Sequence, residues 1–153
     1  MTQTVTKQIL YDTDLNLWLE TVISQLRSHD LQNIDIENLI EELEGLAGRD
    51  RRELKNRLTL LVEHLLKRCY VDMPNGFRGW EKTIRQQRSE LQELLSQSPS
   101  LKRYFAQRFD DAFKDALVEV KDEYETKGYQ FPSAWQFNRD VDSILNQEFW
   151  NKR

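Results

Sequence analysis

Three residues in the stretch from Asn56 to Tyr70 could bind an anion or act on one. Arg57, His64 and Arg68 recur at helical spacing, so they lie in one row along a helix. Two guanidinium groups around an imidazole suit a phosphate, with His64 as acid or base. The alternative is structural: the long side chains cover the margin of a core and pair with carboxylates, and His64 is hydrogen-bonded between helices. The sequence favours this structural interpretation.

Two rows of like charge supply partners for such pairing. Glu37, Glu41 and Glu44 follow one flank of a predicted helix at i, i+4 and i+7, and the bases of residues 78–85 repeat that spacing on another helix. Like charges repel within each row, so packing the two flanks together would relieve both. The sequence therefore predicts an ion-pair or anion cluster with these members: Glu41, Glu44, Arg57, His64, Arg68 and Arg85.

Motifs for catalysis or metal binding are absent from the sequence. It contains no G-x-x-x-x-G-K, no G-x-G-x-x-G and no H-E-x-x-H. Two histidines and one cysteine leave little for a zinc site. Cys69 has basic neighbours, but it falls on a predicted buried stripe, where a structural thiol is the common case. The sequence thus favours a protein without catalysis, cofactor or metal.

The elements that position these residues are all predicted to be helices. The run from Asn56 to Tyr70 is the most apolar, and its leucines recur at the spacing of one helix face, so we expect it to be central. Gly45 and Gly48 predict a break or a bend near Gly48. Further helices are predicted to start at Asp12 or Thr13, at Ile36, at Trp80 and at Ser98, with a short one over residues 141–150. The fold class is all-α, a compact helical bundle of about five to six helices.

Two apolar stripes near the N-terminus are predicted to face the core along their whole length. The inward residues of the first helix are Leu15, Trp18, Leu19, Val22 and Leu26, and those of the second are Leu39, Ile40, Leu43, Leu46 and Ala47. Residues 71–79 contain one proline and two glycines and are predicted to be a loop.

Length and composition indicate one domain over residues 1–153, with 39% hydrophobic and 31% charged residues. About ten residues at the N-terminus are expected to be loosely ordered. The single cysteine excludes an internal disulfide, and the N-terminus lacks the pattern of a secretory signal. No apolar run approaches the roughly 20 residues of a membrane helix. We therefore expect a cytoplasmic protein with no membrane partner.

The net charge of −4 hides an acidic, basic and again acidic order along the chain. Residues 11–48 carry nine acids and one base, residues 49–109 seven acids and fourteen bases, and residues 110–150 ten acids and four bases. A basic middle could be a nucleic-acid footprint, but acidic flanks of comparable size can neutralise it from within. Internal neutralisation is favoured, and nucleic-acid binding stays open.

Several segments stand in a specific order and spacing: YDTDLNLWLE, ENLIEELEGLAGRDRRELKNRL, LLVEHLLKRCY, GWEKTIRQQRSEL and SPSL. In this order the chain, from about Tyr11 to Trp150, resembles the bacterial family called domain of unknown function 29, abundant in cyanobacteria. The resemblance implies an all-helical cytoplasmic protein and brings no established activity or catalytic residues. Arg68 stands where the family often has an aromatic residue, and Gly79 replaces a frequent serine.

Three classes of function fit the sequence. A helical interaction or adaptor module without catalysis, with another protein as partner, fits best, and a homo-oligomer is also compatible. The second class is a nucleic-acid-binding protein that uses the basic middle segment. The third is an enzyme acting on an anionic small molecule near His64, Arg57 and Arg85.

Overall fold

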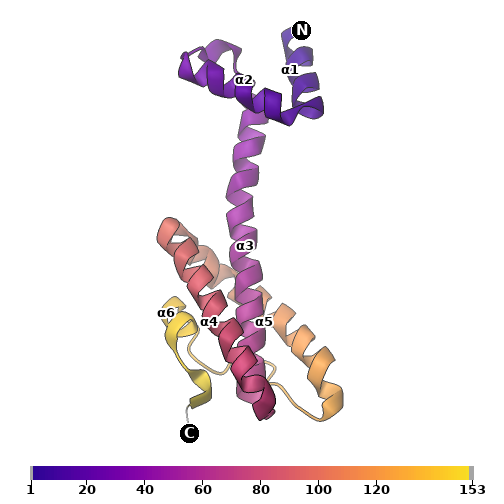
Figure 1. Ribbon diagram of the computed structural model, residues 1–153, viewed down its shortest axis with the longest axis vertical. Helices are drawn as coiled ribbons and strands as arrows, with labels where there is room; N and C mark the ends of the chain where they lie inside the picture. The colour runs from indigo at the N-terminus through magenta and orange to yellow at the C-terminus, as the bar shows by residue number, and fades with distance from the viewer. Residues whose placement is uncertain (1, 152–153) are drawn as a thin grey trace. The chain divides into compact units, whose positions relative to one another are not determined.

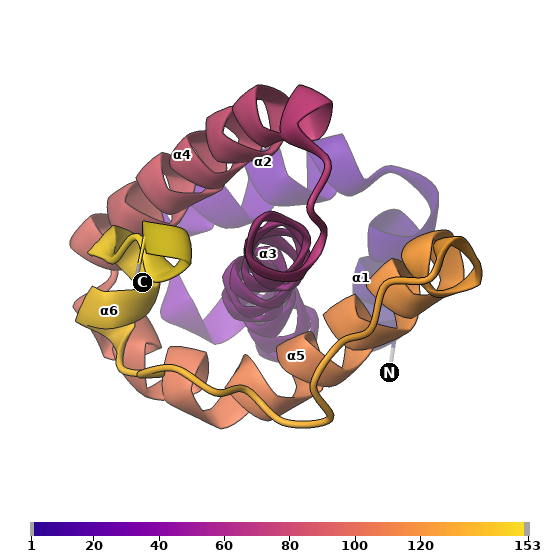
Figure 2. The same ribbon diagram turned by 90° about the horizontal axis from the view of Figure 1, so that it is seen from below.

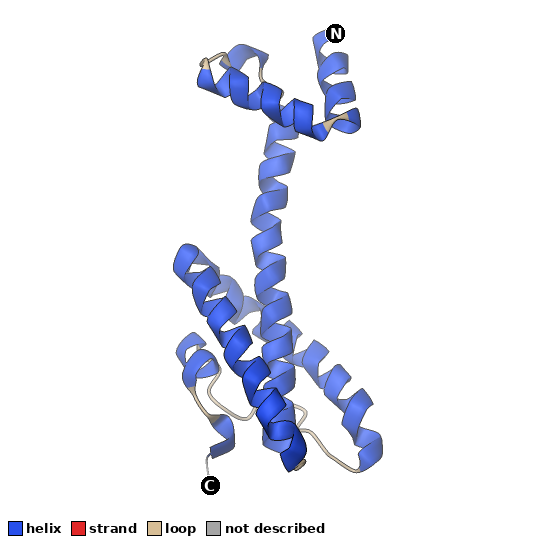
Figure 3. Cartoon of the chain, in the orientation of Figure 1, coloured by secondary structure: helices blue, strands red, loops and turns tan. Residues whose placement is uncertain are grey.

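The computed structural model describes residues 2–151, and among these residues every regular element is a helix (Figure 3). The α-helices are α1 (Thr2–Thr13), α2 (Leu15–Arg27), α3 (Ile36–Tyr70), α4 (Pro74–Gln97), α5 (Lys102–Tyr124) and α6 (Val141–Asn146), and short 3-10 turns cover Leu31–Asn33, Pro99–Leu101, Glu125–Lys127 and Phe149–Asn151. The all-α prediction is confirmed. Residues 1, 152 and 153 of the predicted domain lie outside the described residues.

The chain divides into two compact units, Met1–Gly48 and Arg49–Arg153. The first contains α1, α2 and the beginning of α3, and the second contains the remainder of α3 with α4, α5 and α6 (Figure 1). This division is geometric, so the expectation of a single domain stays a prediction.

The first unit is built around a small core. Trp18, Val22 and Ile34 are its buried residues, and Leu10, Tyr11 and Leu39 pack partly against them. The Trp18 indole donates a hydrogen bond to the Asp35 carboxylate at 2.9 Å, which ties α2 to the start of α3. Desolvation raises the pKa of Asp35, but hydrogen bonds from Asn38 and Trp18 outweigh it and hold that pKa below its ordinary value.

Helix α1 occupies residues for which the sequence indicated loose order. The Tyr11 ring meets Trp18 edge to face, with centroids 4.9 Å apart, and its hydroxyl donates to Glu42 at 2.6 Å. Because α1 continues through Thr13, the predicted cap at Asp12 or Thr13 is wrong. Asp14 caps α2 instead, since its Oδ1 accepts the Leu17 N–H at 3.0 Å.

The second unit has the latter part of α3 at its centre, as predicted. Viewed from below, α4 and α5 flank this helix and α6 lies beside α4 (Figure 2). Leu54, Leu58, Leu61 and Leu65 of α3 are all fully buried. The same core cluster includes Ile84 and Leu91 of α4, Phe105, Phe109 and Ala116 of α5, and Ile144 of α6.

Two predicted helix boundaries are wrong. Helix α3 is one helix from Ile36 to Tyr70, so the predicted break near Gly48 is wrong, and the alternative of a bend there stays a prediction. An isolated helical glycine costs about 1 kcal/mol relative to alanine, which a long helix tolerates. Helix α4 begins at Pro74 rather than Trp80, because proline suits the first helical position. Gly76 is needed in that first turn, since a Cβ there would lie 2.7 Å from the Trp80 ring.

The C-terminal part follows the sequence prediction closely. After Ser98 and Pro99 the chain stays helical through α5 to Gly128, whose φ of 93° is the left-handed conformation of a C-terminal cap. Ile144, Leu145 and Phe149 dock onto the core as expected. The Arg88 guanidinium fastens this segment, donating to the carbonyls of Ile144 at 3.0 Å and Gln147 at 2.6 Å.

Candidate functional site

Helix α2 carries an apolar stripe of which only part is used inside the first unit. Trp18 and Val22 are buried. In the neighbouring row, Leu15, Leu19 and Leu26 were predicted to be buried too, and that prediction is wrong. The members of this row, Leu15, Leu19, Ile23 and Leu26, are 37 to 46% exposed. Because these positions recur at i, i+4, i+8 and i+11, they form one apolar row beside the buried one.

The beginning of α3 repeats this arrangement. Leu39 packs partly against the small core. Ile36, Ile40 and Leu43 recur at helical spacing and are 46 to 54% exposed, and Leu46 is exposed as well. The prediction that Ile40, Leu43, Leu46 and Ala47 face inward is therefore wrong, since all four are exposed. We call the two rows together, Leu15, Leu19, Ile23, Leu26, Ile36, Ile40 and Leu43, the apolar face.

The apolar face is large for so small a unit. Three buried residues in a unit of Met1–Gly48 are a small core, and chains of this size are marginal on their own. Exposed apolar side chains scattered singly are ordinary, whereas rows of them on two helices that border the same core are not. The face thus has the form of a core that lacks its covering layer.

Carboxylates border the apolar face. Glu37, Glu41 and Glu44 lie along the flank of α3 next to Ile40, and all three are exposed. The first unit holds nine acids against Lys7 and Arg27, a net charge of −7. Among the described residues, none of these acids forms an ion pair within the unit. The apolar row on α3 is therefore bordered along one flank by exposed carboxylates.

The members of the predicted ion-pair cluster fall in both units. Glu41 and Glu44 belong to the first unit, whereas Arg57, His64, Arg68 and Arg85 belong to the second, so their pairing stays a prediction. Within the second unit the bases do not share a partner. Arg57 bonds Glu53 at 2.9 Å, lies 3.6 Å from Glu90 and reaches Gln87 at 3.3 Å, while Arg68 meets Glu81 at 3.4 Å and Arg85 is exposed.

His64 is held within its own helix. Its Nδ1 lies 2.9 Å from the Leu60 carbonyl oxygen, to which it donates. Desolvation by burial lowers the pKa of His64, and the positive charge of Lys67 lowers it further. The lowered pKa favours the uncharged imidazole, so burial works against a role of His64 as a cation for an anion.

The comparison with known families decides the identity of the chain. The family model described as Domain of unknown function DUF29 matches residues 10–150. The chain belongs to this family. The resemblance noted from the order of its segments is thereby confirmed. No curated protein and no solved structure matches the chain.

In this DUF29 protein Arg68 is packed against aromatic rings. Its guanidinium carbon lies 3.7 Å from the centroid of the Phe77 ring and 5.4 Å from that of Trp150. A guanidinium stacks on such rings while keeping its donors for Glu81. These contacts give Arg68 a role in joining α3, α4 and the C-terminal turn.

We expect the Cys69 thiol of this DUF29 protein to be unreactive at neutral pH. Burial raises the pKa of Cys69 to about 11, against the opposing charges of Arg68 and Arg88. Only the thiolate attacks, so alkylation by iodoacetamide at pH 7 should be about a hundredfold slower than in the urea-unfolded chain. The folded-state rate should climb until about pH 11. Equal rates for folded and unfolded chains would show that burial does not protect the thiol, and only a faster rate in the folded chain would mark Cys69 as an activated nucleophile and favour an enzyme.

Residues 2–151 show neither a membrane-spanning helix nor a cluster of metal ligands. No helix in this range is long and apolar enough to cross a membrane. Nor does the range bring together three or more His, Cys, Asp or Glu residues in a group that could hold a metal ion.

Proposed function

We propose that this DUF29 protein is a helical protein-interaction module and that the apolar face of its first unit is the docking surface. One observation carries the proposal: apolar rows on α2 and α3 border a core of three apolar residues, yet their side chains stay 37 to 54% exposed. Burying such half-exposed side chains under a partner recovers roughly 25 cal/mol for each Å² of apolar surface.

The partner that fits is an amphipathic helix of another protein with lysine or arginine beside its apolar stripe. The rim of the face carries Glu37, Glu41 and Glu44, and its unit has a net charge of −7. A second copy of the chain would bring two such acidic rims together, so like charges oppose a symmetric dimer through this face. Basic flanks on a partner helix relieve the repulsion within the row instead.

The dimensions of the rows define a probe. The row on α3 extends over residues 36–43, and the row on α2 over residues 15–26, which is about 11 and 17 Å at 1.5 Å per residue. A helix of three to four turns covers either row. The probe is a synthetic helix with leucines at i, i+4, i+7 and i+11 and lysines on both flanks.

Isothermal titration of this basic probe into the full chain tests the proposal. We expect saturable binding, and weaker binding of a matched probe in which every lysine is glutamate. Ile40→Ser combined with Leu43→Ser should weaken binding at least about tenfold, since 1.4 kcal/mol suffices for that change and each burial supplies comparable energy. The control is Val118→Ser on α5, which removes an apolar side chain that is 61% exposed in the second unit.

Sedimentation of the free protein tests whether a second copy of the chain, rather than a partner helix, covers the apolar face. A monomer that binds the basic probe in a way that depends on Ile40 and Leu43 supports the proposal. A dimer that dissociates when these two residues are changed would identify a second copy as the occupant and refute it. Absence of probe binding, or equal loss in the Val118→Ser control, would refute it as well. Nucleic-acid binding and catalysis near His64 stay predictions, which no geometry of the described residues favours over docking.

A further inference from the structure

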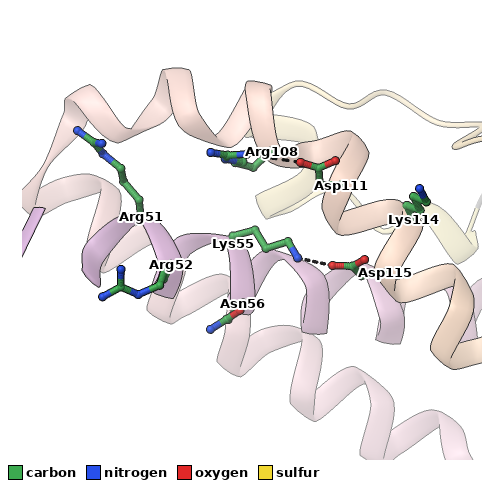
Figure 4. A pocket seen from close by; sticks show the side chains of 8 residues that line it. All are labelled: Arg51, Arg52, Lys55, Asn56, Arg108, Asp111, Lys114 and Asp115. Atoms are coloured by element: carbon green, nitrogen blue, oxygen red, sulfur yellow. Dashed lines mark hydrogen bonds and ion pairs between the residues drawn. The ribbon is translucent and has the colours of Figure 1, made fainter. Parts of the chain in front are cut away.

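A groove between α3 and α5 of the second unit is lined almost entirely by charged side chains (Figure 4). Its volume is about 460 Å³, within the range of small-molecule sites. The lining contains five bases, Arg51, Arg52, Lys55, Arg108 and Lys114, against the carboxylates Asp111 and Asp115. The local net charge is therefore +3, in a protein whose total is −4.

Both carboxylates are already engaged. Lys55 reaches across from α3 to Asp115 of α5, and Arg108 lies 3.5 Å from Asp111 within α5 (Figure 4). Among the described residues, Arg52 and Lys114 form no ion pair. Both negative charges of the groove are thus compensated by ion pairs, and Arg52 of α3 and Lys114 of α5 remain available to a ligand.

A stacking contact holds a third base in place. The Arg51 guanidinium carbon lies 4.5 Å from the centroid of the Tyr104 ring, and that of Arg103 lies 5.2 Å from the same ring. An arginine held over a ring in this way keeps its N–H donors free, because they point outward in the plane of the guanidinium group. Less side-chain entropy is therefore lost when the arginine binds an anion. Arg51 is therefore partly preorganised.

We propose that this groove binds a small anion with two or more linked phosphates. A single phosphate group carries a charge of about −1.5 to −2, which leaves part of the +3 of the lining uncompensated, whereas a linked pair or triple matches it. Guanidinium groups bind phosphate oxygens in bidentate fashion, and Lys114 adds a point charge. A duplex fits less well, because α5 also carries Asp110, Glu119 and Asp122, which would repel its phosphates. The site is independent of the apolar face.

Titration calorimetry with inorganic tripolyphosphate, in magnesium-free buffer at low salt, tests the proposal on the full chain. Arg52→Gln combined with Lys114→Gln should weaken binding at least about tenfold, because these two bases lack partners to compensate their loss. Both side chains are exposed, so the double variant should keep the thermal midpoint of the wild type. The matched control is Lys82→Gln with Arg85→Gln, which removes the same charge from exposed positions of α4 and should change binding less than about twofold.

Parallel arms identify the source of the phosphates. If adenosine triphosphate binds as tightly as tripolyphosphate, the site recognises the linked phosphates and not the nucleoside. Orthophosphate should bind more weakly than either. Undetectable tripolyphosphate binding, or equal loss in the α4 control, would overturn the proposal. A labelled DNA duplex that binds more tightly than tripolyphosphate, and loses affinity with Arg52→Gln and Lys114→Gln, would overturn the small-anion assignment in favour of nucleic acid.

Discussion

Leu61→Ala is expected to lower the free energy of unfolding by about 2–5 kcal/mol. Leu61 is fully buried on α3, at the centre of the second unit, among side chains of α4 and α5. Truncation removes apolar burial and leaves a cavity that rigid helices on several sides cannot close. Equilibrium denaturation in urea measures the loss.

The matched control for Leu61 is its neighbour. Leu60→Ala removes the same atoms from a half-exposed position at the rim of a groove. The loss there should be less than half of that for Leu61→Ala, because solvent or a shifted side chain fills the space. Equal losses for the two variants would show that the wrong face of α3 has been assigned to the core.

Trp18→Ala is expected to unfold the first unit while the second stays folded. Trp18 is one of the three buried residues that form the hydrophobic core of that unit, and it also provides the edge contact to Tyr11 and the hydrogen bond to Asp35. Replacing a buried tryptophan by alanine costs about 3–5 kcal/mol, which is comparable to everything that a core of this size supplies. Hydrogen exchange followed by mass spectrometry should show loss of protection in α2 and retained protection in α5.

Trp18→Phe separates the ring from its hydrogen bond. The phenyl ring keeps much of the apolar contact and the edge geometry to Tyr11, whereas Asp35 loses the indole donor at 2.9 Å. The cost should be about 1–3 kcal/mol, and the first unit should remain protected. If Trp18→Ala instead removes protection from both units together, the chain unfolds as the single domain that its length indicates.

Much of the second unit could be predicted from local sequence signals. These signals act within a turn or two of the chain, so they can be recognised without knowing which elements pack nearby. They are the leucines of α3, the Ser98–Pro99 start before α5 and the cap at Gly128. The exceptions have local causes as well. Helix α4 begins at Pro74 because proline both ends and starts helices, and α3 passes Gly48 because the penalty of one glycine is small.

Only the tertiary structure decided which apolar residues are covered. Leu15 and Val22 belong to the same stripe of α2, and the helical period predicts burial for both. Val22 is buried, however, and Leu15 is 43% exposed. The stripe records the helical period, whereas burial requires a second element on that side, and no pattern within α2 says whether one is present. For this reason the sequence predicted a buried core where the structure has an exposed apolar face.

For the charged residues, too, the sequence determines their positions along each helix, and the packing decides their partners. Equal spacing along the chain marked rows of acids and bases, but spacing alone does not choose partners. Lys55 pairs with Asp115, sixty positions away, and Arg57 turns to Glu53 and Glu90. Ion pairs form between side chains that packing brings within about 4 Å, so the basic groove between α3 and α5 exists only once both helices are packed on their common core. The sequence determined the helices and the charge of each segment, and the packing of the helices decided which charges are left without a partner.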